Sequence, residues 1–205
     1  SFSNVTDRVV QIPWLRTANE GRKFTGAYGI PTELSFRMIN GEYRLVQKPV
    51  RELYEQSSAV KLPCDGAAED PADGKLPERN CPDFVSEENT TPGNICWKTE
   101  EHKAFMVRIK DEGAENRAEI CFRVNGTEIR YMRTTGKLFI GREEYQTEAG
   151  YSEVTILTDD TILELFFDGG ISYGAFELDS FRAAFEAEQA EGRTFSVYVT
   201  DGYCK

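Results

Sequence analysis

The feature that most constrains the fold is a series of short apolar runs with a period of two, separated by turn dipeptides. Between Phe105 and Lys110 apolar residues fill every second position, which places one set on the buried face of a β-strand. Asn125-Gly126 is the favoured pair of a type I′ turn and predicts a hairpin with a two-residue loop. Its register sets apolar residues opposite apolar ones and charges opposite charges. The predicted pairs are Val124 with Thr127, Arg123 with Glu128, Phe122 with Ile129 and Ile120 with Tyr131.

Two further runs, 154–157 and 162–167, flank Asp159-Asp160 and are apolar on both faces, which is typical of strands buried between two sheets. Other strands are predicted at 9–15, 34–38, 43–46 and 195–199, and the turn pair Asn40-Gly41 joins the second of these to the third. Several short strands with turn signals between them favour an all-β fold, an antiparallel β-sandwich of the lectin-like kind.

One segment departs from this pattern, because Asp179 to Glu191 is rich in Ala and Glu. Phe181, Ala184 and Phe185 are spaced i, i+3 and i+4, and Gly192 can end a helix. We therefore expect one short amphipathic helix here, packed on the sheets.

The segment from about 62 to 92 has a different composition from its flanks. It carries five of the eight prolines, and eight acidic residues against two basic ones give it a net charge of −6. We interpret it as a long linker or loop that marks a domain boundary or hides a short edge strand.

Charge limits the partners. The whole chain has 24 Lys and Arg against 35 Asp and Glu, a net charge of −11. This sign opposes binding to nucleic acid and to anionic membranes, and no apolar stretch reaches the length that spans a bilayer. We expect neither nucleic acid nor a membrane as a partner.

The sequence offers little evidence for a metal site or for a catalytic nucleophile with a histidine base. The five cysteines lack the CxxC spacing of a zinc site, so we expect no metal and no cofactor. A disulfide among Cys64, Cys81 and Cys96 would tie down the acidic segment in a secreted protein. The single histidine, His102, lies in a charged stretch, and we interpret it as a solvated residue rather than a catalytic base.

Paired carboxylates are harder to exclude, because glycoside hydrolysis needs only two. Glu33 and Glu164 lie in predicted strands. We interpret both as structural, and if Glu164 is buried between its leucine neighbours it needs a hydrogen-bonding or charged partner.

Four blocks of sequence, in this order and spacing, resemble glycoside hydrolase family 32, which contains invertases, levanases, inulinases and sucrose-6-phosphate hydrolases. The blocks are 9–16 (Val-Val-Gln-Ile-Pro-Trp-Leu-Arg), 30–37 (Ile-Pro-Thr-Glu-Leu-Ser-Phe-Arg), 44–53 (Arg-Leu-Val-Gln-Lys-Pro-Val-Arg-Glu-Leu) and 160–170 (Asp-Thr-Ile-Leu-Glu-Leu-Phe-Phe-Asp-Gly-Gly). In the last block, Thr161 and Ile162 depart from the family's serine-containing pattern, and the acidic segment is longer than expected.

The resemblance implies three parts: residues 1–53 as the terminal strands of an incomplete β-propeller catalytic domain, 54–92 as an acidic, proline-rich linker, and 93–205 as a C-terminal β-sandwich. Family 32 enzymes carry their nucleophile Asp, their stabilising Asp and their general acid Glu in strings that do not occur here. The chain by itself is therefore expected to be catalytically silent, and its parent protein is expected to be a β-fructosidase.

The resemblance also implies partners. The first hypothesis is a non-catalytic module that supports the catalytic propeller of the same enzyme, acts with it on fructan or sucrose, and forms contacts in a homo-oligomer. Trp14 then matches a tryptophan that lines the sugar pocket, with a core tryptophan as the alternative. This hypothesis predicts an exposed apolar edge near residues 8–38.

Two other hypotheses stay open. A fructan-binding or other carbohydrate-binding module would display a row of exposed aromatic residues, for which the candidates are Trp97, Tyr131, Tyr145 and Tyr173. An unrelated interaction domain of an acidic secreted protein is the third. The clustered cysteines favour an extracellular over a cytoplasmic location.

Overall fold

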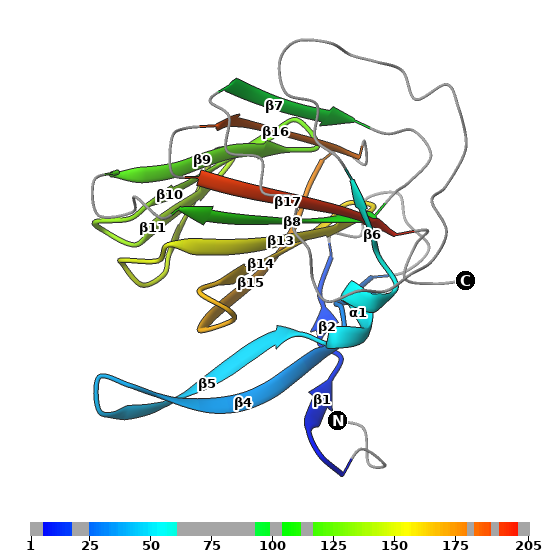
Figure 1. Ribbon diagram of the computed structural model, residues 1–205, viewed down its shortest axis with the longest axis vertical. Helices are drawn as coiled ribbons and strands as arrows, with labels where there is room; N and C mark the ends of the chain where they lie inside the picture. The colour runs from blue at the N-terminus through cyan, green and yellow to red at the C-terminus, as the bar shows by residue number, and fades with distance from the viewer. Residues whose placement is uncertain are drawn as a thin grey trace.

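The computed structural model describes residues 6–17, 25–60, 93–98, 104–111, 117–179, 183–189 and 193–200. Two six-stranded antiparallel sheets face each other in this part of the chain (Figure 1). The prediction of an all-β sandwich is therefore confirmed. The first sheet, in spatial order, contains β12 (Glu143–Gln146), β11 (Lys137–Ile140), β10 (Thr127–Met132), β9 (Glu119–Val124), β16 (Ala184–Gln189) and β7 (Gly93–Lys98). The second contains β15 (Ser172–Glu177), β14 (Ile162–Phe167), β13 (Glu153–Asp159), β8 (Ala104–Asp111), β17 (Arg193–Thr200) and β6 (Ser58–Val60).

The main core lies between these sheets, and period-two patterning builds it. Phe105, Val107 and Ile109 of β8 point inward, each at most 1% exposed. Alternate residues of β9, β10, β13 and β14 meet them, and the Tyr151 ring stacks on Phe167 at 5.2 Å. Burial of this apolar surface is the principal source of the sandwich's stability.

The hairpin registers follow the turn chemistry. All the pairs predicted around Asn125-Gly126 are present, and both turn residues have positive φ, 52° and 82°. Asn40-Gly41 forms the same kind of turn between β4 (Thr32–Ile39) and β5 (Glu42–Pro49). The two apolar runs that flank Asp159-Asp160 form a third hairpin, whose loop is Asp160-Thr161 because Asp159 pairs with Ile162.

The helix predicted at 179–191 is wrong. Residues 184–189 form β16, which lies between β7 and β9 and pairs with both. Phe185 and Ala187 are buried in the core while Glu186 between them is half-exposed, so the segment follows a period of two. Pairing with two neighbouring strands outweighs the helix propensity of Ala and Glu. In the described ranges the helix is α1 (Arg51–Glu55), which is too short and polar to span a membrane.

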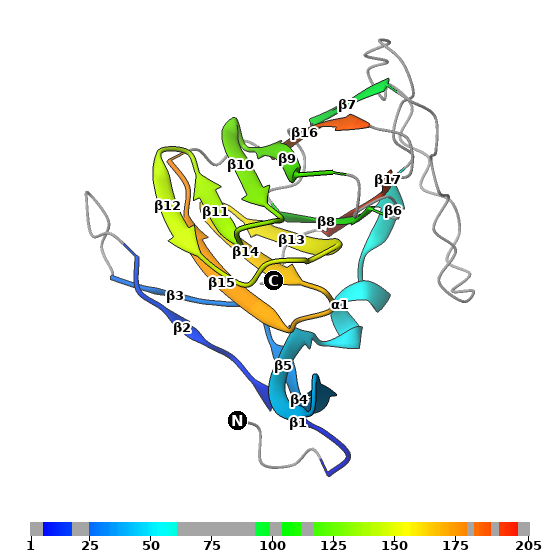
Figure 2. The same cartoon turned by 90° about the vertical axis from the view of Figure 1, so that its left-hand side faces the viewer.

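The N-terminal strands form a separate layer below the sandwich (Figures 1 and 2). It contains a three-stranded sheet of β1 (Val9–Gln11), β4 and β5, a two-stranded pair of β2 (Trp14–Leu15) and β3 (Ala27–Tyr28), and α1. This layer covers the outer face of the second sheet, where Val10, Ile30, Val50 and Leu53 pack against Met106, Leu157 and Phe166. We call this contact the seam. It explains why β13 and β14 are apolar on both faces.

The predicted linker begins inside the structured part. Residues 58–60 form β6, an edge strand that pairs with β17. Residues 61–92 lie outside the described ranges, and the boundaries 1–53, 54–92 and 93–205 stay a prediction.

Candidate functional site

Exposed apolar side chains gather on the N-terminal layer. In the described part of the chain, eight large apolar residues are exposed, and all eight lie between residues 9 and 45. Five of them share one face of the three-stranded sheet, because Val9 lies beside Leu34, Phe36 opposite Leu45, and Met38 opposite Tyr43. We call these five residues, Val9, Phe36, Met38, Tyr43 and Leu45, the apolar face. Its Phe36 and Tyr43 rings are 74% and 75% exposed, so this is the exposed apolar edge that the first hypothesis predicts.

The opposite face of the same sheet is turned to the sandwich. Val10 and Val46 are buried there, and the Arg44 guanidinium forms an ion pair with the Glu148 carboxylate. The backbone N–H of Gln47 donates to the carbonyl of Gly170, at 2.9 Å. These contacts hold the apolar face outward, away from the sandwich.

Trp14 is a surface residue rather than a core residue. It pairs with Tyr28 across β2 and β3, and the two rings meet edge to face at 5.3 Å. They are 63% and 73% exposed. The alternative of a core tryptophan is therefore wrong, whereas a role in sugar binding stays a prediction.

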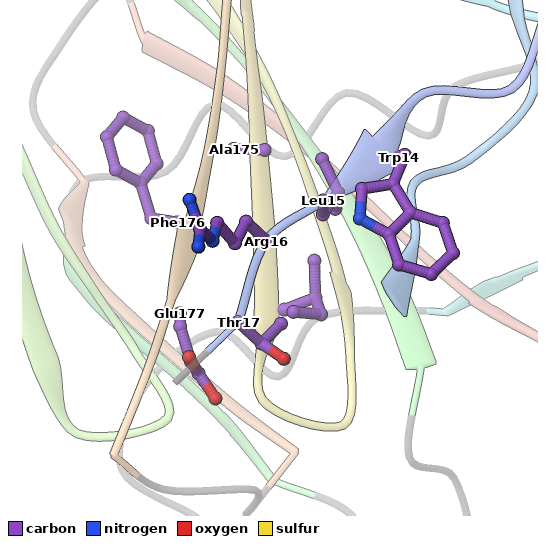
Figure 3. Close-up of a pocket in the computed structure, with 8 residues that line it drawn as sticks. Trp14, Leu15, Arg16, Thr17, Ala175, Phe176 and Glu177 are labelled. Carbon is purple, nitrogen blue, oxygen red and sulfur yellow. The ribbon is translucent and has the colours of Figure 1, made fainter. Parts of the chain in front are cut away.

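A cleft of about 150 Å³ lies between β2 and the β14–β15 hairpin (Figure 3). The residues that line it are Trp14, Leu15, Arg16, Thr17, Ile162, Ala175, Phe176 and Glu177. In Figure 3 the Trp14 ring and the Arg16 side chain extend to opposite sides of the N-terminal strand. The cleft thus combines an aromatic ring with a guanidinium and a carboxylate from two different layers.

Two of the four aromatic candidates for carbohydrate binding are core residues. Trp97 is 8% exposed and packs edge to face on Phe105. Tyr131 is 1% exposed, and its hydroxyl donates to the Glu148 carbonyl at 2.8 Å while it accepts from the Tyr151 N–H at 3.0 Å. Neither ring can stack on a sugar in this conformation.

The other two aromatic candidates are partly buried and have partners of their own. The Tyr145 ring packs on Phe176 at 4.9 Å, where β12 and β15 meet. The Tyr173 ring packs on Phe166 at 4.9 Å, and its hydroxyl donates to Glu164 at 2.6 Å. The four candidates therefore form no exposed row.

The two predicted carboxylates have structural surroundings. Glu164 is 3% exposed and accepts from the Ile30 N–H at 2.8 Å and from the Tyr173 hydroxyl. Burial raises the pKa of Glu164, and these two hydrogen bonds offset only part of that rise. The Glu33 carboxylate lies 3.9 Å from the Arg8 guanidinium at the edge of the N-terminal layer. The hydrogen-bonding partner expected for a buried Glu164 is thus confirmed.

His102 and the side chains of Cys64, Cys81, Cys96 and Cys204 lie outside the described residues, so the predicted disulfide is untested there. Cys121 is a free, partly buried thiol in β9. Within the described ranges, no three His, Cys, Asp or Glu side chains cluster in a way that could hold a metal ion.

An ionic cluster that the sequence analysis did not predict lies at one end of the sandwich. The buried Asp111 carboxylate accepts from Arg117, from Arg133 at 3.0 Å and from Arg193 at 3.0 Å. Burial alone would raise the pKa of Asp111, but the hydrogen bonds from Arg193 and Arg133 lower it below its usual range. Arg117 is close to Asp111 in the sequence, but Arg133 and Arg193 are 22 and 82 residues away, so no local spacing signals the whole cluster.

Solved structures share this fold. An exo-inulinase from Aspergillus awamori aligns with a TM-score of 0.63 at 15% identity, over 94% of this chain and 40% of the inulinase. A family 32 β-fructofuranosidase from Bombyx mori aligns with a TM-score of 0.61 at 12% identity, over 96% of this chain and 39% of its own. A sucrose-6-phosphate hydrolase from Lactobacillus gasseri aligns with a TM-score of 0.56 at 9% identity, over 94% of this chain and 38% of the hydrolase.

No protein-family model matches the sequence, and no curated protein matches it significantly. The chain spans about two fifths of the length of the three solved structures. It therefore has the fold of one part of the glycoside hydrolase family 32 enzymes, which fits the C-terminal part that its sequence motifs predict.

Proposed function

We propose that this chain is the non-catalytic C-terminal module of a family 32 glycosidase that acts on fructan or sucrose, and that its apolar face packs against the catalytic propeller. The observation that carries the proposal is that, among the described residues, the exposed large apolar side chains are confined to the N-terminal layer. A contiguous exposed apolar patch on a folded protein marks an interaction site.

The three-stranded sheet supports a propeller as the partner. Propeller blades are four-stranded sheets, and β1, β4 and β5 make three. The outer edge of β5 is engaged by Gly170, whereas β1 pairs with β4 on one side and, within the described ranges, ends the sheet on the other. A fourth strand from the partner would extend the sheet at β1, with main-chain hydrogen bonds that complement the apolar contacts.

The share of the solved structures that this chain matches supports the same partner. About three fifths of each related enzyme has no counterpart here, and that part must supply the catalytic carboxylates, since the family's three catalytic strings are absent from this sequence. Retaining hydrolysis needs two carboxyl groups about 5 Å apart. In this proposal, Glu33 and Glu164 serve as framework residues.

The test is to assay hydrolysis of sucrose, levan and inulin by the purified chain alone and by the chain co-expressed with the propeller segment of its own parent protein. We expect no released sugar from the chain alone, and a stable complex with hydrolysis after co-expression. Hydrolysis by the chain alone, or failure of the two parts to co-purify, would contradict the proposal.

A second candidate function is carbohydrate binding, and the exposed Trp14–Tyr28 pair beside the cleft favours it. An exposed indole face can stack on the apolar face of a sugar ring. Calorimetric titration with levan, inulin and sucrose tests this function, with Trp14→Ala as the variant and Phe36→Ala, which changes another exposed aromatic residue, as the control. Saturable heat that only Trp14→Ala removes would establish it, and absence of heat would leave the scaffold function.

A further inference from the structure

The Glu164 side chain leaves the sandwich and enters the seam. Its neighbours in β14, Leu163 and Leu165, point into the main core, whereas Phe166 packs in the seam cluster. In the seam, one carboxylate oxygen of Glu164 accepts from the backbone N–H of Ile30 and the other from the Tyr173 hydroxyl. A single side chain thus joins the sandwich to the backbone of the N-terminal layer.

The chain at Gly29 is fitted closely around this carboxylate. A Cβ atom at Gly29 would lie 3.0 Å from Oε2 of Glu164 and 2.7 Å from Cγ of Pro13. The Gly29 N–H also donates to the Pro13 carbonyl at 2.9 Å, which fixes the path of the backbone. The absence of a side chain at Gly29 therefore lets residues 29–30 pass directly over the carboxylate.

The carboxylate is buried beside neutral and acidic groups. From β15 the Tyr173 hydroxyl faces it, from β13 Asp159 acts on it as a like charge, and from the N-terminal layer the backbone of Gly29 and Ile30 covers it. In the ionised form the carboxylate accepts both hydrogen bonds. In the protonated form Oε1 can still accept from Ile30 while the new O–H donates to Tyr173. Both forms fit, but burial beside a like charge disfavours the ionised one.

We propose that Glu164 is a proton-responsive clasp, which holds the N-terminal layer tightly to the sandwich when it is protonated and loosens the seam when it is ionised. Loosening follows because a buried carboxylate gains solvation when the seam opens, whereas a neutral carboxyl gains little. The direction agrees with the raised pKa of Glu164, since the closed seam binds the proton more strongly than the open one. The clasp does not depend on the proposed function, because all its parts lie within this chain.

Amide hydrogen exchange at Ile30 tests the clasp, measured by NMR on the 205-residue chain between pH 4 and pH 8. After correction for the intrinsic exchange rate, the protection factor at Ile30 should fall as pH rises, by at most about tenfold per pH unit, because one proton is linked to closure. Ile129, in the core of the sandwich, is the internal reference, and its protection should not follow the same profile.

Variants separate the clasp from general stability. Glu164→Gln keeps an acceptor for Ile30 and a donor for Tyr173 but cannot titrate, so protection at Ile30 should become independent of pH. Glu144→Gln, at an exposed carboxylate on the rim of the other sheet, should leave the wild-type profile unchanged. Tyr173→Phe removes a hydrogen bond that both forms of the Glu164 carboxyl make, so protection at Ile30 should be lower than in the wild type over the whole pH range.

The proposal is overturned by a wild-type profile at Ile30 that does not change with pH, or by a Glu164→Gln profile that falls as steeply as the wild type. It is also overturned if Ile30 and Ile129 lose protection in parallel, because that would be global unfolding.

Discussion

Asp111 lies fully buried beneath three arginines, and its charge is matched by hydrogen bonds rather than by solvent. A buried ion pair is weak evidence for net stability, but removing one partner leaves uncompensated charge. Here the loss of one carboxylate would leave three guanidinium groups to repel one another. The cluster is therefore sensitive to any change at Asp111.

We predict that Asp111→Asn lowers the free energy of unfolding by about 3–5 kcal/mol, the usual cost of an unpaired buried charge. The matched control is Glu153→Gln, which breaks a partly exposed ion pair to Arg108 and should cost about 1 kcal/mol or less. Urea unfolding measures both values. Equal losses in the two variants would show that the cluster does not stabilise the sandwich.

Gly170 lies in the β14–β15 turn, and its carbonyl accepts a hydrogen bond from Gln47 of β5. It ends the block 160–170 that resembles family 32, and a side chain at this position would clash with β5. Its φ is +94°, and a Cβ atom there would lie 2.0 Å from the carbonyl oxygen of Gln47. We predict that Gly170→Ala is less stable than Gly126→Ala by about 1–3 kcal/mol of overpacking. Gly126 is a matched control because its φ is +82° and the space around it is open. Equal unfolding midpoints in urea would contradict the steric reason.

Among the elements, those whose determinants are local could be predicted from the sequence. The Asn-Gly turns fix both chain reversal and register within a few residues, so the hairpin at Asn125-Gly126 matches in every predicted pair and Asn40-Gly41 joins β4 to β5. The segment 184–189 could not be predicted, because its conformation depends on β7 and β9, which are distant in sequence. At the candidate site, the exposed apolar edge could be predicted, because residues 1–53 were expected to be propeller strands that lack their neighbouring strands. By contrast, the bond between Glu164 and Ile30, 134 residues apart, has no local signal.

The position of Ala187 distinguishes the observed strand β16 from the helix that the sequence predicts for the same segment. In the strand, Ala187 is buried opposite Phe122, whereas in the predicted helix it lies away from the face formed by Phe181, Ala184 and Phe185. We predict that Ala187→Lys lowers the free energy of unfolding by more than about 3 kcal/mol, the cost of an uncompensated buried charge. The control Glu186→Gln changes the half-exposed neighbour and should cost less than about 1 kcal/mol. Tolerance of Ala187→Lys in thermal unfolding would favour the helix.

At the scale of the whole molecule, two buried carboxyl groups respond to pH in opposite directions. The pKa of Asp111 is lowered from its ordinary 3.8, so its contribution to stability is present above that value and is lost as pH falls. The pKa of Glu164 is raised from its ordinary 4.5, so its contribution is full below that value and is lost as pH rises through the folded-state pKa. A fall in pH therefore destabilises the sandwich at Asp111 but stabilises the seam at Glu164. The stability of the two regions should not reach its maximum at the same pH.

The apolar face points away from the sandwich, so a partner can reach it. In the isolated chain, a second copy of the chain should bind there. We predict that the double variant Phe36→Ser with Leu45→Ser reduces self-association, because it removes one cross-strand pair from the centre of this face. Both side chains are exposed, so the free energy of unfolding in urea should change by no more than about 0.5 kcal/mol per site. Sedimentation velocity over a range of concentrations measures the association. Arg37→Ser is the control, since Arg37 is exposed on the opposite face of the same strand and its loss should leave association intact. Equal association in the double variant and the control would show that the interface lies elsewhere, whereas a loss confined to the double variant would identify this face as the contact surface.

Co-expression of the double variant and of the control with the propeller segment then tests whether one surface binds both partners, because a face that binds the propeller cannot at the same time bind a second copy.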